Sequence, residues 1–375
     1  MTNRPTTVAA IVLTGLAVAA VPTAAQAATA CEPQVSASVN EELTERFGTY
    51  GDTAGRWTGA DSAYSVPLPD GSTAWLYSDT FMGEVNDDLS RPIDSPFLHN
   101  SIIVDASAVD DSGDLTTVTG GTEAAPESLV KVPGGDEHQN WYWFGDGTVE
   151  GDTLQVMLLE FVKTGTGVFD FAFAGNAVAS FDTDDMSLTA ITDLPESTVN
   201  WGSAIYEDPQ DGHTYVFGVE DNQAQKFAHL ARVPSGSLAS GPWEYYADGA
   251  WSADPDASTR ILEGVSNEFS VQRYQGRFTL VTGDATEPLS AKIVMYRSDD
   301  LAGPYTDKTV LYETPETGGN VFTYNAKAHP HLGDGDTLLI TYNVNSFVGD
   351  DLYADAHLYR PRYIDVDVRI PGRRR

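Results

Sequence analysis

Two aspartates, Asp61 and Asp79, stand on either side of a short turn that can bring their carboxyl groups together. They flank or lie in two segments with strand character, 63–68 and 72–81, which are separated by Pro69-Asp70-Gly71. Proline suits the first corner of a type I turn, and glycine supplies the left-handed residue of a three-residue hairpin loop. If this loop closes a hairpin centred on residue 70, Asp61 lies opposite Asp79.

Two opposed carboxyl groups favour a chemical role over a structural one. Cβ atoms directly opposite each other in an antiparallel pair are roughly 4.5–5.5 Å apart, and like charges there destabilise a sheet. Hydrolysis of a glycosidic bond needs two carboxyl groups at about this separation, one as acid and one as base or nucleophile. In the structural alternative, Asp61 ends a loop, Asp79 caps a turn, and a bulge changes the register between them.

The neighbours of the two aspartates predict which one is the acid. Strand alternation places Trp75 and Phe81 on the face of Asp79, and apolar surroundings disfavour a charged carboxylate. Asp61 has only small neighbours in the sequence, so we expect it to be better solvated and to keep its charge. The sequence therefore predicts Asp79 as the general acid and Asp61 as the base or nucleophile.

The elements that position these residues belong to a repeated unit of two apolar strands joined by a turn with Gly or Asp. Copies lie at 61–79, 128–147, 200–221, 267–284 and 324–345, and further strand follows each copy. Five four-stranded antiparallel sheets around one axis form a five-bladed β-propeller, which is an all-β fold. A β-sandwich is the alternative, but it does not require the unit to recur five times.

A propeller gathers the polar ends of these hairpins at one mouth of its axis. Carboxylates accept hydrogen bonds from hydroxyl groups, and tryptophan rings stack on sugar faces, so this mouth suits a neutral polyhydroxylated ligand. Strand alternation favours a core position for Trp143, and His329 before Pro330 has the alternative of bonding only to the backbone. The supporting or substrate-binding residues predicted at the mouth are Asp146, His99, Asn100, Trp201, Glu268, Asn325, His329 and Asn343.

The N-terminus has the pattern of a secretory signal peptide, with an apolar stretch at 8–21 and a cleavage site at Ala25-Gln26-Ala27. We expect secretion after removal of residues 1–27. A cut after Ala30 would instead expose Cys31 to lipidation, and the alternative localisation is therefore a lipid-anchored protein.

Cys31 is the only cysteine, so the chain forms no internal disulfide. The domains expected after the signal are a lead-in segment at 28–56, with a short helix around 40–47, and a single propeller at 57–375.

Charge and missing motifs exclude other functions. The formal net charge is −34, which excludes ordinary nucleic-acid binding and argues against anionic substrates. The sequence has no His-Glu-x-x-His zinc pair, no Gly-x-Ser-x-Gly elbow and no phosphate-binding loop. We predict no metal or cofactor in the chemistry, although a propeller axis can hold a structural calcium ion. We expect a monomer without a transmembrane segment that acts on a neutral polysaccharide.

Several motifs carry a family resemblance. They are Trp57-Thr-Gly-Ala-Asp61, Trp75-Leu-Tyr-Ser-Asp79-Thr-Phe, Pro96-Phe-Leu-His-Asn100-Ser, Asn140-Trp-Tyr-Trp-Phe-Gly-Asp146-Gly and Tyr324-Asn-Ala-Lys-Ala-His329-Pro. Together they resemble a family of secreted actinobacterial proteins, long catalogued as a domain of unknown function, whose relatives include endo-D-arabinanases with five-bladed propellers. The catalytic aspartates of that branch match Asp61 and Asp79, although Ser78 stands where many relatives have glycine.

The resemblance implies a glycoside hydrolase that acts on a furanose-rich polysaccharide, with D-arabinan as the leading substrate. The alternative is a non-catalytic carbohydrate-binding or adhesion propeller that kept the scaffold without turnover. A protein that only binds has no need of two opposed carboxyl groups, so the pair Asp61 and Asp79 separates the two hypotheses.

Overall fold

The computed structural model describes residues 33–109 and 114–370. The predicted signal peptide and Cys31 lie outside these residues. Within them, no helix is both long and apolar enough to cross a membrane.

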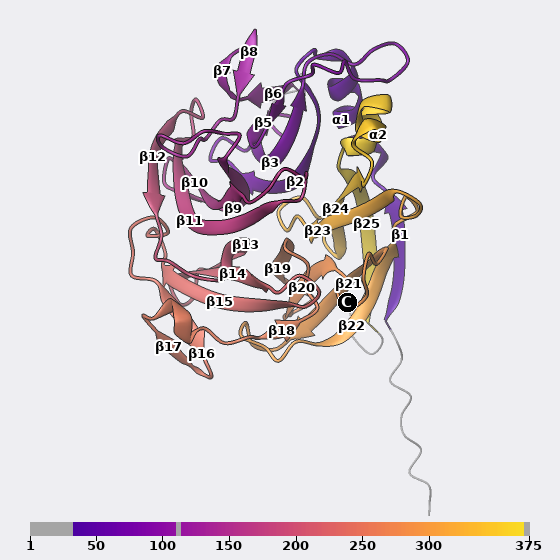
Figure 1. Cartoon of the computed structure of the whole chain (residues 1–375). Coiled ribbons are helices and arrows are strands. Elements are labelled where there is room, and N and C mark those ends of the chain that lie inside the picture. The colour runs from indigo at the N-terminus through magenta and orange to yellow at the C-terminus, as the bar shows by residue number, and fades with distance from the viewer. Residues whose placement is uncertain (1–32, 110–113, 371–375) are drawn as a thin grey trace, which may run out of the picture.

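Five small antiparallel sheets lie in a ring around one axis, which confirms the predicted five-bladed β-propeller (Figure 1). Blade 1 consists of β2 (Trp57–Pro67), β3 (Thr73–Met82), β5 (Ser101–Asp105) and β6 (Leu115–Val118), and the short β4 (Phe97–Leu98) pairs with β3. Blade 2 consists of β9 (Asn140–Glu150), β10 (Thr153–Lys163), β11 (Phe171–Asp182) and β12 (Leu188–Asp193). A separate small hairpin, β7 (Gly120–Thr122) and β8 (Ala125–Glu127), lies between them in sequence.

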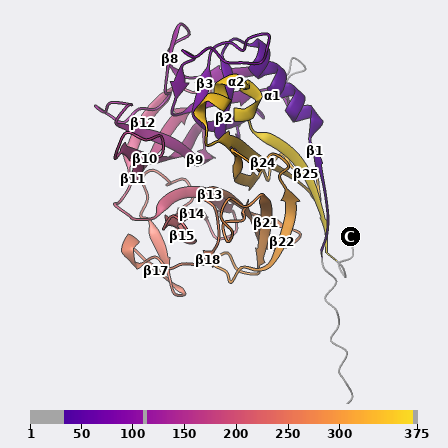
Figure 2. The ribbon, with the colours of Figure 1, turned by 45° about the vertical axis from the view of Figure 1, so that its right-hand side comes forward.

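The remaining blades follow in chain order around the ring (Figures 1 and 2). Blade 3 consists of β13 (Asn200–Asp208), β14 (His213–Asp221), β15 (Lys226–Pro234) and β16 (Glu244–Ala247), with the short β17 (Ala250–Ser252), η1 (Pro255–Ala257) and β18 (Leu262–Glu263) at its outer side. Blade 4 consists of β19 (Phe269–Tyr274), β20 (Arg277–Gly283), β21 (Lys292–Ser298) and β22 (Thr306–Glu313). Blade 5 contains β23 (Val321–Ala328), β24 (Thr337–Ser346) and β25 (Arg362–Arg369).

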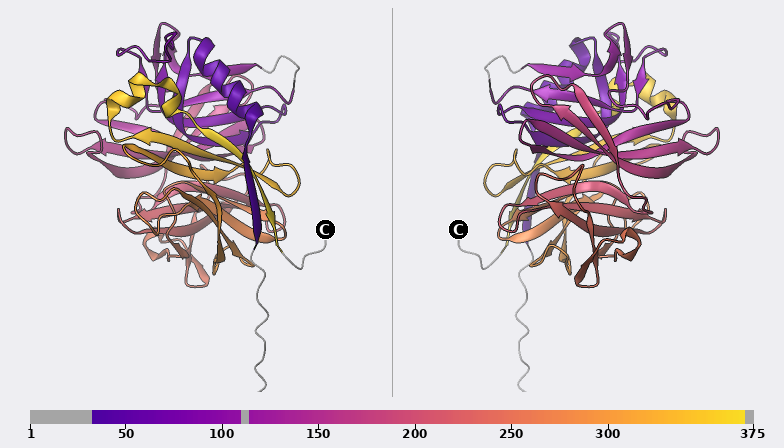
Figure 3. Two further views of the ribbon diagram at one scale, coloured as in Figure 1. Left: turned by 90° about the vertical axis from the view of Figure 1, so that its right-hand side faces the viewer. Right: turned by 90° about the vertical axis from the view of Figure 1, so that its left-hand side faces the viewer.

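The fourth strand of blade 5 comes from the other end of the chain. β1 (Gln34–Val39) pairs antiparallel with β25, and Figure 3 shows the two strands side by side. The segment 28–56, which the sequence predicts as a lead-in, therefore contributes a strand to the propeller. The predicted helix follows as α1 (Glu41–Thr53), where the Asn40 side chain accepts a hydrogen bond from the Leu43 N–H at 2.9 Å. An asparagine at this position satisfies one of the free N–H groups of the first helical turn.

The hydrophobic core is divided among the contacts between blades. The inner strands β2, β9, β13, β19 and β23 touch their neighbours in this order around the ring. Five clusters of buried apolar side chains lie between successive blades; Tyr64 and Phe144, for example, pack between blades 1 and 2. Burial of apolar area is worth roughly 25 cal/mol per Å², so each blade is stabilised mainly by its two neighbours.

Four of the five predicted inner hairpins are confirmed, and the second is wrong. The sequence pairs 128–132 with 140–147, whereas β9 pairs with β10 across the turn at Gly151. The segment 128–132 is held by blade 1 instead, because the Asn100 side chain bonds to both the N–H and the carbonyl of Val130 at 2.7 and 2.8 Å.

Candidate active site

The β2–β3 hairpin carries the two predicted catalytic aspartates and closes as the sequence predicts. The Leu68 N–H donates to the Ser72 carbonyl at 2.8 Å, and Gly71 has a φ of +94°. Pairs between residues 64–67 and 73–76 follow the predicted register. The sequence therefore places this half of the hairpin correctly.

A bulge interrupts the hairpin at the level of the aspartates. The register shifts at Ser62 and returns at Ala60, which pairs with Thr80. Asp61 lies in this bulge and Asp79 precedes Thr80, so the two stand beside each other on neighbouring strands. The two residues after Asp61 have φ values of +74° and +61°. Left-handed conformations of this kind cost roughly 1–3 kcal/mol each and cluster at functional sites.

Bulges at the same level occur in the inner strands of three other blades. The register shifts between residues 144 and 147 in β9, between 201 and 204 in β13, and between 324 and 327 in β23. A bulge turns side chains out of the strand alternation and is common beside active sites. These bulges let polar side chains from several blades meet at the axis.

Asp61 is half-buried and is held by two tyrosines of blade 5 and the segment before β25. Its Oδ2 accepts hydrogen bonds from the hydroxyl groups of Tyr324 and Tyr359 at 2.7 and 2.8 Å. Its Oδ1 is shielded from solvent and has no hydrogen-bond partner among the described residues. Burial, and then the charge of Asp79, raise the pKa of Asp61 to about 8, while the two tyrosine hydroxyls oppose the shift. These surroundings favour the protonated form of Asp61, in contrast to the expectation that it keeps its charge.

Asp79 has a more polar environment than its sequence neighbours suggest. Its Oδ1 faces His99 Nδ1 at 3.0 Å and accepts a hydrogen bond from the Trp143 indole N–H at 2.8 Å. The side chain is 19% exposed, and its Oδ2 has no partner among the described residues. His99 Nε2 faces the Glu137 carbonyl at 3.2 Å, so a doubly protonated ring would donate to both acceptors. Asp79 is therefore held through one carboxyl oxygen, and its other oxygen is open.

A buried ion pair lies next to the aspartates. Lys327 Nζ is 2.6 Å from Glu268 Oε2, and Glu268 Oε1 accepts a hydrogen bond from the Ser62 hydroxyl at 3.0 Å. The ammonium also donates to the Ser62 carbonyl and lies 4.4 Å from the centre of the Tyr64 ring. Burial raises the pKa of Glu268 and lowers the pKa of Lys327. The negative charge of Glu268 contributes to the raised pKa of Asp61.

Asp146 is not a turn residue, because it lies in the bulge of β9. Its two carboxyl oxygens accept hydrogen bonds from the N–H groups of Gly147 at 2.9 Å and Ile205 at 2.7 Å. The second bond links blade 2 to blade 3. Burial raises the pKa of Asp146 to about 7, and the charge of Lys327 opposes this shift. Asp146 therefore contributes a group at the axis that titrates near neutral pH.

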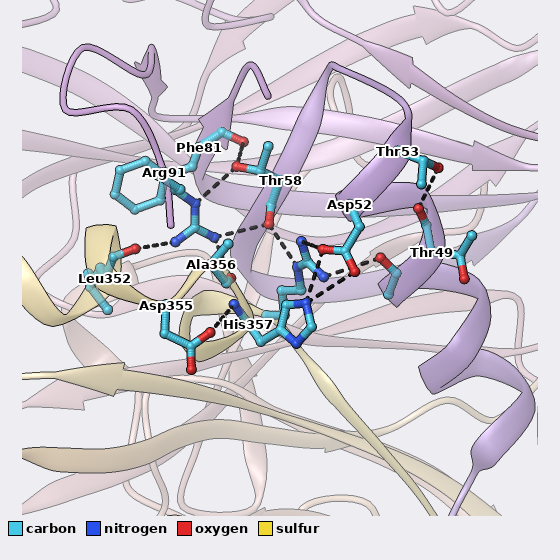
Figure 4. Close-up of polar contacts among 12 residues, drawn as sticks. Thr49, Asp52, Thr53, Thr58, Phe81, Arg91, Leu352, Asp355, Ala356 and His357 are labelled. Carbon is cyan, nitrogen blue, oxygen red and sulfur yellow. Dashed lines mark hydrogen bonds and ion pairs between the residues drawn. The ribbon is translucent and has the colours of Figure 1, made fainter. Parts of the chain in front are cut away.

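A buried arginine fixes the segment that delivers Tyr359 to Asp61. Arg91 is 3% exposed and donates to the Thr58 carbonyl at 3.0 Å and to the Ala356 carbonyl at 2.6 Å (Figure 4). These bonds join β2 to the loop of α2 (Gly349–Ala354) and η2 (Ala356–Tyr359). No carboxylate of the described residues lies within ion-pair distance of Arg91. Burial lowers its pKa to about 9.

Three predicted substrate-binding residues are buried and have structural partners. Asn100 is fully buried and bonds to backbone atoms of Val130 and Tyr142. Trp201 is 2% exposed and belongs to the core cluster between blades 2 and 3. His329 is also 2% exposed, and its ring nitrogens lie 2.6 Å from the Ser65 hydroxyl and 2.8 Å from the Thr341 hydroxyl. Their burial and their partners favour the supporting role over the substrate-binding role, the two roles that the sequence left open for them.

The two predicted asparagines of blade 5 lie close to the site without a direct contact to the aspartates. Asn325 has a φ of +56°, and its carbonyl accepts a hydrogen bond from Lys327 at 2.9 Å. Asn343 is 1% exposed, and neither atom of its amide has a partner among the described residues.

Sequence reasoning gave no role to Tyr324, Tyr359 and Ser62, and for Trp143 it favoured a core position over stacking on a sugar. Tyr324, Tyr359 and Ser62 contact Asp61 or Glu268, and Trp143 contacts Asp79. Tyr359 had no usable signal, because it stands in a 3-10 turn of the last blade. Trp143 lies two residues after Trp141, so the strand period places both on one face, close to where the strand starts near the mouth. This spacing could have indicated a place at the site.

Solved structures with a similar fold add a comparison. A Bacteroides ovatus protein, described as a proposed hydrolase, matches with a TM-score of 0.74 at 22% identity, over 88% of this chain and 90% of that one. This likeness shows a shared fold. An α-L-arabinofuranosidase from Podospora anserina has a TM-score of 0.46 at 10% identity (85% and 92% covered). A GH43_1 enzyme from Xanthomonas citri complexed with xylotriose has a TM-score of 0.47 at 14% identity (83% and 87% covered). The latter two scores are too low to carry an argument.

Sequence comparison gives the family but no characterised relative. No curated protein matches the chain. The actinobacterial origin and the relation to endo-D-arabinanases stay predictions. The family profile that matches residues 44–368 spans every blade of the propeller. The chain therefore belongs to the family described as "Domain of unknown function (DUF5005)".

Proposed function

We propose that this protein is a secreted, monomeric glycoside hydrolase that cleaves a furanose-rich neutral polysaccharide, with D-arabinan as the leading substrate. Asp61 and Asp79 are its reacting pair. The observation that carries the proposal is that two adjacent carboxyl groups have different surroundings. Asp61 bonds to two tyrosine hydroxyls and its pKa is raised to about 8, whereas Asp79 accepts the Trp143 N–H and faces His99 through one oxygen and has the other free. Glycoside hydrolysis uses two carboxyl groups whose environments differ in this way.

The roles follow from these surroundings and reverse those predicted from sequence. Asp61 is the general acid and gives its proton to the glycosidic oxygen as the bond from the anomeric carbon breaks. Asp79, through its free Oδ2, either attacks the anomeric carbon or takes a proton from the attacking water. The first route leaves a covalent intermediate and retains the anomeric configuration, and the second inverts it. Proton NMR of the first product formed distinguishes them.

A carbohydrate-binding propeller without turnover is the second candidate. The charged groups at the axis argue against it, because carboxyl groups and an ammonium group partly or wholly withdrawn from water cost free energy unless their function requires them. A lectin can bind hydroxyl groups with neutral side chains. Asp61, Asp146, Glu268 and Lys327 are all shifted away from their usual pKa values by burial.

The test is release of oligosaccharides from D-arabinan, L-arabinan, fructan and xylan by the purified protein. We expect products from D-arabinan and none after either the Asp61→Asn or the Asp79→Asn change. Both variants should keep the melting temperature of the wild type within a few degrees. If the wild type binds a polysaccharide and releases nothing from any of the four, the non-catalytic hypothesis is correct.

The pH profile provides a second test of Asp61 as the acid. Its proton must be present, so activity should fall as pH rises through its pKa of about 8. Tyr359→Phe removes a hydroxyl that stabilises the ionised form, so the alkaline limb should move to higher pH. Glu268→Gln removes a negative charge, so the limb should move to lower pH.

These opposite shifts are measured from kcat/KM between pH 5 and 10, which is about the range where an acid with this pKa titrates. Thr309→Val, on an outer strand of blade 4, is the control and should leave the limb unchanged. Shifts in the same direction for both variants would contradict the assignment of Asp61.

A further inference from the structure

Blade 2 carries a cluster of aromatic side chains that lies outside the five core clusters between the blades. Trp143 on β9 packs on Phe161 of β10 with ring centres 4.4 Å apart, and on Phe171 of β11 at 5.0 Å. Phe173 contacts Phe161 at 6.0 Å. None of these rings belongs to the five core clusters between the blades. We call Trp143, Phe161, Phe171 and Phe173 the blade-2 aromatic cluster.

The cluster lies at the same end of the propeller as the reacting pair. Trp143 is near the start of β9, Phe161 near the end of β10 and Phe171 at the start of β11. The indole N–H of Trp143 donates to Asp79 Oδ1 at 2.8 Å, so the cluster is continuous with the candidate active site. That bond also fixes the ring plane relative to the carboxylate.

The cluster is open to solvent on part of its surface. Trp143, Phe171 and Phe173 are only half-buried. The loop between β10 and β11 adds two apolar side chains, Val168 at 80% and Phe169 at 60% exposure. Large apolar side chains that stay exposed beside a cluster that contacts Asp79 through Trp143 indicate a binding surface rather than a core.

The chemistry of the surroundings identifies the ligand. The net charge of −34 and the carboxyl groups at the axis disfavour an anionic ligand. A sugar ring has an apolar face of C–H groups that stacks on an aromatic ring, and hydroxyl groups at its edge that reach Asp79 and His99. A wholly apolar ligand would leave Oδ2 of Asp79 without a partner.

We propose that the blade-2 aromatic cluster is a stacking subsite for a neutral sugar unit next to the bond that is cleaved. The sugar lies against Trp143, and the following unit of the chain extends over Phe171 toward Phe169. This inference rests on the proposed function, because it takes Asp79 as a reacting group. It makes the substrate a polymer, since a single sugar cannot occupy both positions.

The experiment measures binding and cleavage separately. Binding is measured by retardation in native gels that contain D-arabinan or xylan, in the Asp61→Asn background so that no polymer is consumed. Trp143→Ala and Phe171→Ala should each weaken binding to D-arabinan by about tenfold, as expected for one lost aromatic contact. Trp143→Phe keeps a ring and should retain most of the binding. Trp251→Ala, which removes a half-buried tryptophan from the outer side of blade 3, is the matched control.

The outcomes separate this inference from the proposed function. Equal retardation of Phe171→Ala, Trp143→Ala and the control overturns the subsite, and cleavage by the wild type then leaves the proposed function intact. Retardation that depends on Trp143 and Phe171, without cleavage by the wild type, supports the subsite and overturns the hydrolase. The subsite is also overturned if every variant, including Trp251→Ala, loses binding. It is equally overturned if a gel that contains a hydrophobic peptide retards the protein and neither polysaccharide does.

Discussion

Asp61→Asn is expected to lower kcat/KM on a polysaccharide by about 10²- to 10⁴-fold, the contribution of a positioned general acid. The same variant should recover most of its activity on an aryl glycoside, whose leaving group departs without protonation. Asp79→Asn should lose as much on the polysaccharide and recover little, because the leaving group cannot replace a base or nucleophile. Activity on the aryl glycoside is measured as the initial rate of phenol release, and activity on the polysaccharide as the initial rate at which reducing ends form.

The reverse pattern would restore the assignment predicted from sequence. If Asp79→Asn rather than Asp61→Asn is rescued by the aryl substrate, Asp79 is the acid. Asn keeps the size of the side chain, so neither change disturbs the packing of the hairpin. A melting curve of each variant checks this directly.

Gly59→Ala is expected to have the largest effect on stability. A Cβ atom at this position would lie 2.1 Å from the Tyr359 carbonyl oxygen and 2.4 Å from Arg91 Nη2. The first contact is with a backbone oxygen, which cannot rotate away as a side chain can. The η2 turn must therefore move away from β2. We expect a loss of about 3 kcal/mol, the upper end for an overpacked site.

The same change should abolish most activity, because the displaced turn carries Tyr359 away from Asp61. Gly175→Ala is the matched control, since it is also a strand glycine and a Cβ there meets nothing within 4 Å. Unfolding monitored by tryptophan fluorescence gives both stabilities. A Gly59→Ala variant as stable and as active as Gly175→Ala would contradict the close approach of η2 to β2.

The sequence predicts the fold well because the repeated hairpin is a local signal. Pro69-Asp70-Gly71 fixes both the turn and the register next to it, and the observed pairs agree up to Tyr64. The failure at 128–147 has a long-range cause. Asn100 of blade 1 captures Val130, and no pattern within 128–147 reveals a partner 30 residues away.

The site is less predictable from sequence than the fold. Strand alternation assigns side chains to faces, and the bulges at Ser62, Asp146 and Asn325 break that alternation where the polar groups meet. Asp61 was expected to be solvated because its neighbours are small, but the shielding comes from Tyr324 and Tyr359, far along the chain. The contact between Asp79 and His99 could be expected, because His99 precedes the third strand of the same blade and was predicted to reach the mouth.

The pairing of β1 with β25 affects when the candidate active site is completed during synthesis of the chain. This pairing joins the two ends of the described chain, so it has the highest sequence separation of any in the fold and is expected to form late. Tyr324 and Tyr359 reach Asp61 across the same junction between the last and the first blade. A growing chain that has made only its first four blades already holds both aspartates, but Asp61 lacks its two tyrosine partners. The candidate site is thus completed in the final step of folding, after the whole propeller has been made.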